Sequence, residues 1–247
     1  EVLTILPSDE QLCFLPLCHV LERLTSVDLP IHRGCIVNFA ESTETVFENM
    51  KEVSPNTFTA VPRLWEKMYA VIANMRSDAS AFNGWAFDKA IKAGYDYADV
   101  IMAGNTPTTA QKLRYEFWDK LVLRKLRDLI GMTNIRRAAT GAAPISLDII
   151  RWFHAIGVPI YEGYGMTESS GVISINTPDA NRAGSVGKIL PNSEVRIADN
   201  GEILVKGGNV FAGYWNKPEK TAEDLRDGWL HTGDVGELKD GYLFITG

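Results

Sequence analysis

The sequence predicts a mixed α/β fold, in which a mostly parallel sheet is flanked by helices and a small antiparallel, β-barrel-like subdomain follows. In residues 1–185, short apolar runs alternate with amphipathic helical stretches, which is typical of parallel sheets covered by helices. In residues 186–247, short alternating segments are separated by tight turns, which is typical of antiparallel hairpins. We therefore expect an α/β part over 1–185, with a helical insertion at 62–131, and a β subdomain over 186–247.

The composition is that of an ordinary globular protein. Of the 247 residues, 45% are hydrophobic and 23% are charged, and the formal net charge is -6. These proportions exclude the disordered, collagen-like and disulfide-scaffold classes. The acidic balance, together with the lack of zinc-finger or RNA-binding patterns, argues against nucleic acid as a partner.

The first part of the chain carries three short apolar runs, which we expect to be strands buried on both faces: 12–18, 36–39 and 57–61. Between the last two runs, a helix is expected from about Ser42 to Val53, with Ser42 as its N-cap. A strand, a helix and a second strand at this spacing predict a parallel sheet with helices on its faces.

The insertion begins at Pro62, which suits the first turn of a helix. Further helices are expected over about 85–102 and 109–130. In the last one, Leu113, Phe117 and Leu121 recur at helical spacing and should form its packing face. Its outer face should be basic, through Lys112, Arg114, Lys120, Arg124, Lys125 and Arg127. This basic region suits either an anionic ligand or membrane surface, or a plain solvated face.

Strand and helix alternate again after residue 134. Strands are expected over 135–140 and 158–161, with a helix between them that Ser146 caps. Each strand is followed by a glycine-containing loop, at 141–144 and 163–168. Because ligands bind beyond the carboxyl ends of parallel strands, we expect both loops to line one crevice. On spacing alone, two purely structural turns fit equally well.

Two dipeptides mark hairpins in the β subdomain. Asn200-Gly201 separates 194–199 from 202–206, and Asp240-Gly241 separates 235–238 from 242–245.

The three cysteines, Cys13, Cys18 and Cys35, are too few and too irregularly spaced for a disulfide framework or a zinc site. Cys13 and Cys18 stand in an apolar stretch, so we expect both to be buried thiols. Unpaired cysteines predict a reducing, cytoplasmic compartment.

Common catalytic signatures are missing, because the chain has no Walker A loop, no G-x-G-x-x-G fingerprint and no G-x-S-x-G elbow. Instead, YEGYGMTESSGV (161–172) resembles the Y-G-x-T-E signature of the adenylate-forming enzymes. This superfamily comprises acyl-CoA synthetases, luciferases and peptide-synthetase adenylation domains. Further segments resemble its other motifs in the family's order: LPLCHVLER (15–23), TGAAP (140–144), GEILVKGGNVFAGYWNKPEKT (201–221) and WLHTGD (229–234).

The helical insertion that begins with PRLWEKMYAVI (62–72) is most similar to that of long-chain fatty acid–CoA ligases. The resemblance implies that a fatty carboxylate attacks ATP to give acyl-adenylate and pyrophosphate, and that coenzyme A then displaces AMP. It thus implies ATP/AMP and Mg²⁺ as cofactors, with fatty acid and coenzyme A as substrates. The expected location is cytoplasmic, with a possible peripheral membrane contact. Two alternatives stay open: a fatty acyl-AMP ligase that loads a carrier protein, and a non-catalytic nucleotide-binding module.

The resemblance also implies site residues. At the adenine it places Gly141, Ala142, Ala143 and Tyr164. It places Thr167 at the α-phosphate and Glu168 on magnesium, and Asp234 at the ribose hydroxyls. His19 would lie near the acyl carboxylate and pyrophosphate, while Gly163 and Gly165 would leave room for the acyl chain beside the nucleotide. For His19 and Asp234, a structural hydrogen bond and a turn cap are the respective alternatives.

Three parts of the family pattern are not in this sequence. We expect the phosphate loop with its lysine to lie upstream of Glu1, and the hinge arginine and the carboxy-terminal domain with its lysine to follow Gly247. Without both lysines, residues 1–247 alone should turn over poorly or not at all. Ala142 also stands where the family frequently has glycine.

Overall fold

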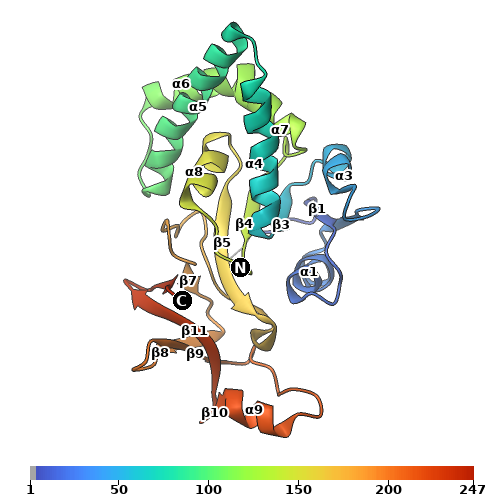
Figure 1. Cartoon of the computed structure of the whole chain (residues 1–247), viewed down its shortest axis with the longest axis vertical. Coiled ribbons are helices and arrows are strands. Elements are labelled where there is room, and N and C mark those ends of the chain that lie inside the picture. Colours follow the sequence, from blue (N-terminus) through green and yellow to red (C-terminus); the bar gives the residue numbers. More distant parts are fainter. Residues whose placement is uncertain (1–3) are drawn as a thin grey trace. The chain divides into compact units, whose positions relative to one another are not determined.

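The computed structural model describes residues 4–247, which form two compact units, 4–161 and 162–247. The change of sequence character near residue 185 falls inside the second unit. Helices and strands mix in the first unit, and strands dominate the second (Figure 1). The predicted mixed α/β class is confirmed. No helix in the described part of the chain is long and apolar enough to cross a membrane.

The strands of the first unit form two parallel pairs. Strand β1 (Glu10–Cys13) pairs with β2 (Ile36–Phe39), and β3 (Thr57–Ala60) pairs with β4 (Arg137–Thr140). Parallel strands are therefore present as expected, but β2 and β3, which precede and follow the predicted helix, lie in different sheets and do not pair with each other. Strand β1 ends at Cys13, so most of the apolar run 12–18 lies outside it. Burial on both faces was wrong for β2, because this edge strand exposes Ile36 and Phe39.

A helical segment that the sequence analysis did not predict follows β1. It consists of α1 (Val20–Arg23), a π-helical turn η1 (Leu24–Asp28) and α2 (Leu29–Arg33). The buried Glu22 carboxylate ties it to the preceding loop by accepting the Leu15 N–H at 2.9 Å.

The next helix, α3 (Val46–Val53), begins later than predicted. Ser42 is not its N-cap, because the Ser42 hydroxyl closes a separate turn by accepting the Thr45 N–H at 3.3 Å. Thr45 occupies the N-cap position instead.

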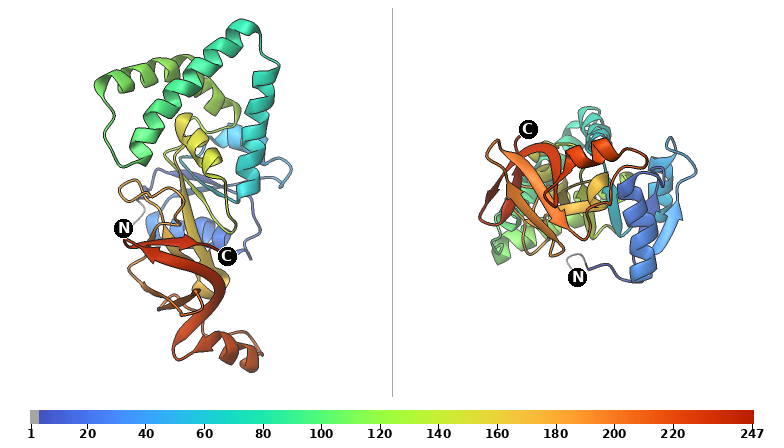
Figure 2. Two further views of the ribbon diagram at one scale, coloured as in Figure 1. Left: turned by 60° about the vertical axis from the view of Figure 1, so that its left-hand side comes forward. Right: turned by 90° about the horizontal axis from the view of Figure 1, so that it is seen from below.

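The helical insertion is confirmed as α4 (Pro62–Ser77), α5 (Ala81–Met102), α6 (Thr109–Trp118), the π-helical turn η2 (Asp119–Leu123) and α7 (Arg124–Leu129). These helices gather at one end of the first unit (Figure 2, teal to light green). In α4, the apolar stripe buries Trp65, Met68 and Ile72 completely. Pro62 is in the first turn, as predicted.

The expected packing face of the third helix is wrong. Leu113, Phe117 and Leu121 are 61%, 57% and 48% exposed. The core instead receives Leu123 and Leu126, because the π-helical turn η2 changes which side of the helix faces the unit.

Arg127 is likewise not on an outer face. Its Nη1 lies 2.6 Å from Asp119 Oδ1, and the same atom donates to the Ile156 carbonyl at 2.6 Å.

Helix α8 (Leu147–Ala155) completes the first unit and is capped by Ser146, whose hydroxyl accepts the Asp148 N–H at 3.2 Å. It packs on α5 almost backbone to backbone. A Cβ at Gly94 would overlap the Ala155 carbonyl oxygen, so only glycine allows this approach.

The second unit is an antiparallel sheet. Its strands are the last part of β5 (Ile160–Met166), β6 (Gly171–Ile175), β7 (Lys188–Ile189), β12 (Tyr242–Ile245), β11 (Trp229–Lys239), β9 (Glu202–Gly207) and β8 (Ser193–Ile197), in that order, with β10 (Leu225–Arg226) beside β11. Both predicted hairpins are confirmed: β8 with β9, and β11 with β12. Within the described residues the strand order is open, so the subdomain is not a closed barrel.

All three cysteines are free thiols. Cys13 is buried as predicted, but the prediction for Cys18 was wrong, because Cys18 lies in the exposed loop that follows β1.

Candidate functional site

The predicted site residues fall into two groups. The first unit carries His19, Gly141, Ala142 and Ala143, and the second carries Gly163, Tyr164, Gly165, Thr167, Glu168 and Asp234. Each group has its own local geometry. The assignments to adenine, ribose, phosphate and acyl chain remain predictions.

Tyr164 and Asp234 lie together in the second unit although 70 residues separate them in the sequence. The Tyr164 hydroxyl donates to Asp234 Oδ2 at 2.6 Å. Burial raises the pKa of Tyr164, and the hydrogen bond to the carboxylate raises it further. The phenol therefore stays protonated and keeps donating to Asp234. Strand β5 and the Thr-Gly-Asp turn are thereby joined.

The Thr-Gly-Asp turn is a bulge in strand β11. Pairing with β9 shifts register between His231 and Val235, and Gly233 takes a left-handed φ of 75°. The Thr232 hydroxyl donates to the Ile203 carbonyl at 2.7 Å and accepts the Asp234 N–H at 3.2 Å. These bonds hold Asp234 in a defined position beside Tyr164.

Glu202 clamps the same turn from β9, and the sequence analysis did not single it out. One carboxylate oxygen lies 2.9 Å from His231 Nδ1, and the other accepts the Gly233 N–H at 3.1 Å. Burial opposes the charge on Glu202, but these two hydrogen bonds outweigh it and lower its pKa. Both the G-E motif and the H-T-G-D motif can be read from the sequence. The contact of Glu202 with His231 cannot, because it depends on the register of β9 and β11.

Residues 163–166 were expected in a loop, and the structure corrects this. They continue strand β5, and only Thr167–Ser169 forms a turn, the 3₁₀ helix η3. Gly165 is required by the backbone, because a Cβ there would overlap the Gly171 carbonyl oxygen of β6. The pairing of β5 and β6 shifts register between Tyr164 and Gly165.

The turn η3 is built on Ser169, which is 1% exposed. Its hydroxyl accepts the Met166 N–H at 3.1 Å and lies 2.9 Å from the Gly171 carbonyl. Thr167 is exposed on this turn. Glu168 directs Oε1 toward the Tyr214 hydroxyl, which lies 2.8 Å away.

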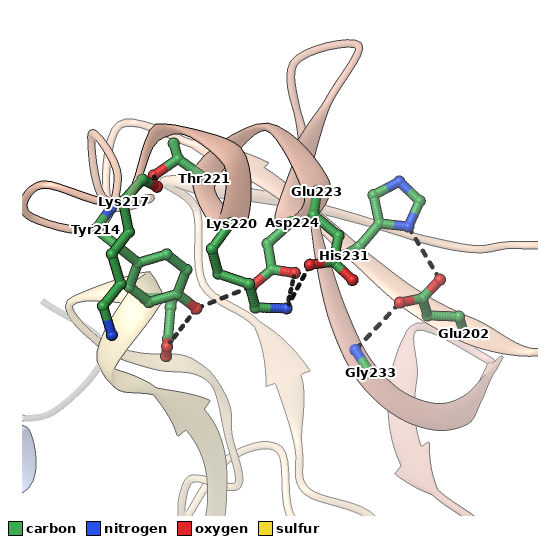
Figure 3. Close-up of polar contacts among 10 residues, drawn as sticks. Glu202, Tyr214, Lys217, Lys220, Thr221, Glu223, Asp224, His231 and Gly233 are labelled. Carbon is green, nitrogen blue, oxygen red and sulfur yellow. Dashed lines mark hydrogen bonds and ion pairs between the residues drawn. The ribbon is translucent and has the colours of Figure 1, made fainter.

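A pocket of about 300 Å³ opens in the second unit. Its wall includes Met166 from the end of β5 and Thr232 and Gly233 from the turn in β11, which are sequence neighbours of predicted site residues. The predicted residues themselves are not part of the wall: Tyr164, Thr167, Glu168 and Asp234. Ionisable side chains make up much of the remaining wall: Glu202, Tyr214, Lys220, Glu223, Asp224, Arg226 and His231. Figure 3 shows the hydrogen bonds of these residues, apart from Arg226, which it does not label. A polar cavity with both signs of charge suits a ligand that carries anionic and hydroxyl groups.

In the first unit, the loop after β4 has an unusual backbone. Ala142 takes φ of 66°, a region that favours glycine, which explains why a glycine would be usual there. The buried Thr140 hydroxyl, at the end of β4, has no hydrogen-bond partner among residues 4–247.

His19 is the N-cap of α1 and accepts the Leu21 N–H through Nδ1 at 3.2 Å. The alternative named for His19, a structural hydrogen bond, is therefore present in the structure as a helix cap.

One carboxylate oxygen of Glu168 is available to a magnesium ion that arrives with a nucleotide. No group of three His, Cys, Asp or Glu side chains forms a ready-made metal site within residues 4–247. Magnesium commonly binds through one or two carboxylates, with phosphate oxygens and water completing its shell. Glu168 has one oxygen, Oε1, engaged by Tyr214 and offers the other.

Comparison with known proteins gives close matches over the chain. The family described as AMP-binding enzyme matches residues 2–215. The long-chain-fatty-acid–CoA ligase FadD15 of Mycobacterium bovis is 37% identical over 246 residues, which cover 99% of this chain and 40% of that protein. The chain thus spans less than half the length of this curated relative.

Two solved structures share the fold. The N-terminal domain of FACL13 from Mycobacterium tuberculosis matches with a TM-score of 0.67 at 22% identity, covering 100% of this chain and 53% of that one. The o-succinylbenzoate coenzyme A synthetase (MenE) from Bacillus subtilis, in complex with ATP and magnesium ion, matches with a TM-score of 0.64 at 22% identity, covering 98% and 42%. On the extent of the family match, this chain belongs to the AMP-binding enzyme family.

Proposed function

We propose that the whole protein activates long-chain fatty acids with ATP and transfers the acyl group to coenzyme A. The observation that carries the proposal is the Tyr164–Asp234 hydrogen bond, which joins the two motif regions. A polar pocket lined by Met166 and Gly233, close to these residues in the sequence, supports it. The similarity to long-chain-fatty-acid–CoA ligases supports the choice of acid and acceptor. The free thiols of Cys13, Cys18 and Cys35 support a reducing, cytoplasmic location.

In the first step a fatty carboxylate oxygen attacks the α-phosphorus of ATP, the bond to the β-phosphate oxygen breaks, and pyrophosphate leaves. The thiolate of coenzyme A then attacks the acyl carbon, and AMP leaves. Such steps need positioning and charge neutralisation more than a protein nucleophile. This requirement agrees with a site made of hydrogen-bonding and metal-binding groups.

Each residue of the second unit has a proposed task. Asp234 accepts hydrogen bonds from the ribose hydroxyls, and Tyr164 packs along the adenine while holding Asp234 in place. The Thr167 hydroxyl binds the α-phosphate region. Glu168 holds the magnesium ion, which when bound neutralises phosphate charge. The acyl chain is proposed to pass beside Gly163 and Gly165, although the space that a Cβ would occupy at either glycine faces β6, through Ser174 at Gly163 and Gly171 at Gly165.

For the first unit, we propose that Gly141, Ala142 and Ala143 flank the adenine. The left-handed Ala142 turns the loop backbone so that its amides are available to a flat ligand. His19 is proposed near the acyl carboxylate and pyrophosphate, through the ring nitrogen that does not cap α1.

Calorimetric titration of the chain with AMP tests the nucleotide site. We expect binding that Asp234→Ala weakens by about tenfold or more, because a charged hydrogen-bond acceptor is removed. Product analysis on the whole protein, with and without coenzyme A, tests the reaction. Acyl-CoA is expected. Acyl-adenylate that passes only to a carrier protein would indicate the acyl-AMP ligase, and nucleotide binding without any product would indicate a binding module.

A second proposal concerns peripheral membrane contact through the first unit. Leu113, Phe117 and Leu121 form an exposed apolar stripe, and Trp118 continues it through edge contacts with Phe117 and Trp85. Basic side chains on the same helical segment have no ion-pair partner among the described residues: Lys120, Arg124 and Lys125. Apolar side chains with basic neighbours suit an anionic lipid surface.

Co-sedimentation with vesicles that contain anionic lipid tests this contact. We expect salt-sensitive binding that Phe117→Ser reduces, whereas Ile31→Ser, at a residue 81% exposed elsewhere in the first unit, leaves binding unchanged. Binding that ignores both salt and anionic lipid would contradict the proposal.

A further inference from the structure

The chain between β9 and α9 braces the turn that carries Glu168. Asn209 Nδ2 donates to the Ser169 carbonyl at 3.2 Å, and the Phe211 N–H donates to the Glu168 carbonyl at 2.8 Å. The Tyr214 hydroxyl reaches Glu168 Oε1 at 2.8 Å. Both the backbone and the carboxylate of Glu168 are thus held by one segment, 209–214. Its Tyr214 is 46 residues from Glu168 in the sequence.

Tyr214 is itself fixed to the start of α9 (Pro218–Asp224). Its N–H donates to the Thr221 hydroxyl at 2.9 Å, and its ring meets Phe211 edge to face with centroids 4.8 Å apart. Gly213 allows this approach, because a Cβ there would lie 2.6 Å from Thr221 Cγ2 and its φ is 140°. The position of the Tyr214 ring is therefore fixed by Phe211 before it and by Thr221 after it in the sequence.

The Tyr214 hydroxyl lies between two carboxylates but has one proton to donate. Asp224 Oδ2 is 3.0 Å away, and Glu168 Oε1 is 2.8 Å away. Lys220 Nζ binds the other oxygen of Asp224 at 2.8 Å and partly neutralises that carboxylate (Figure 3). Asp224 is thereby the weaker acceptor, so the phenolic proton is directed to Glu168.

We propose that Tyr214 is a positioning residue that fixes Oε1 of Glu168 and so presents Oε2 to the cation that accompanies ATP. Asp224 and Lys220 set the direction of its hydroxyl. This inference rests on the proposed function, in which Glu168 holds magnesium. Tyr214 touches neither nucleotide nor cation in this role. It acts through the carboxylate alone.

The test compares two ligands on the full chain, ATP with Mg²⁺ and metal-free AMP, by calorimetric titration. Tyr214→Phe keeps the ring and removes the hydroxyl. We expect affinity for the magnesium–ATP complex to fall about fivefold to twentyfold, because a hydrogen bond to a charged group is lost, while affinity for AMP changes less than about twofold. The matched control is Tyr242→Phe, whose ring contacts with Arg182 and Lys188 do not need the hydroxyl.

A second variant, Asp224→Asn, separates positioning from direct binding of the cation. The amide can donate to the Tyr214 oxygen and leaves the hydroxyl directed at Glu168. We therefore expect magnesium–ATP affinity to stay within about twofold of the original chain. A large loss in Asp224→Asn would make Asp224 a cation ligand and overturn the inference.

Two further results overturn it. In one, Tyr214→Phe binds magnesium–ATP as well as the original chain does. In the other, it loses AMP and magnesium–ATP affinity equally, which is the result of a structural defect. If the original chain binds neither ligand, the nucleotide site proposed for this chain fails, and the inference fails with it. The behaviour of the original chain therefore distinguishes the two failures.

Discussion

The two units are stabilised by different means. The first unit has an extended apolar core around Trp65, Met68 and Phe153, in which rings meet edge to face. The second has a small aliphatic core, which includes Ile203 and Leu243, and its turns are held by buried or half-buried hydrogen bonds. The comparison indicates that substitutions in the first unit act mainly on stability, whereas polar substitutions in the second act mainly on the candidate site.

The largest effect is expected from Trp65→Ala in the first unit. Trp65 is fully buried, and its Nε1 donates to the Ala60 carbonyl at 3.2 Å. The free energy of unfolding should fall by about 3–5 kcal/mol, because a large cavity forms. Urea denaturation measures it. The control, Trp215→Ala at a side chain 89% exposed in the second unit, should change it by less than about 0.5 kcal/mol. Similar losses in both variants would contradict the comparison.

Asp234→Ala, in the second unit, should change AMP affinity more than it changes the free energy of unfolding. It removes the acceptor of the Tyr164 hydroxyl and should lower the free energy of unfolding by only about 1 kcal/mol. AMP affinity should fall by about tenfold or more, for the reason given with the proposed function. Asp199→Ala, at an exposed position of the same unit, is the control for both measurements. If Asp234 merely caps its turn, affinity will not change.

His154 should make the first unit sensitive to acid. Burial lowers the pKa of His154, while its hydrogen bond to the Ile160 carbonyl at 2.8 Å partly opposes this. Below about pH 6.5 the unfolded chain binds a proton that the folded chain resists, so stability falls as pH decreases. Above that pH both states are neutral and the effect is absent.

Urea denaturation between pH 7 and pH 5 measures this dependence. The contribution of His154 is about 1.4 kcal/mol for each unit by which its pKa differs between the two states. His154→Gln should reduce the slope of stability against pH, whereas His32→Gln, at an exposed histidine, should not. An unchanged slope in His154→Gln would show that other groups dominate acid sensitivity.

The smallest effect concerns the loop after β4. Ala142→Gly should raise the free energy of unfolding by about 1 kcal/mol or less, because glycine adopts φ of 66° without strain. Ala143→Gly should lower it by about 0.4–1 kcal/mol, since added glycine there only loosens the unfolded chain. Thermal unfolding of the two variants should therefore shift in opposite directions. A shift in the same direction for both variants would contradict the backbone strain assigned to Ala142.

Prediction from the sequence worked best where one short stretch carries the whole signal. The hairpins at Asn200-Gly201 and Asp240-Gly241, the Ser146 cap and the Pro62 start all match the structure. It was wrong for Ser42 and for the face of Leu113, because a nearby turn and a π-helical turn decide these features. Neither of these two turns produces a recognisable pattern in the sequence around it.

The candidate site shows the same limit. Its motif letters were readable, and the resemblance assigned them roles, yet Glu202 and Tyr214 received none. Their partners lie 29 and 46 residues away in the sequence, and Asp234 lies 70 residues from Tyr164. Such pairs follow from strand order and register, which single motifs do not specify.

The amino-acid sequence by itself determined the long helices of the insertion and both hairpin turns, because backbone preferences and caps depend on residues close along the chain. Only the tertiary structure decided which polar groups meet: Tyr164 with Asp234, His231 with Glu202, and Tyr214 with Glu168. The physical reason is that a buried hydrogen-bonding group takes the partner that strand pairing brings within about 3 Å, however distant that partner is in the sequence.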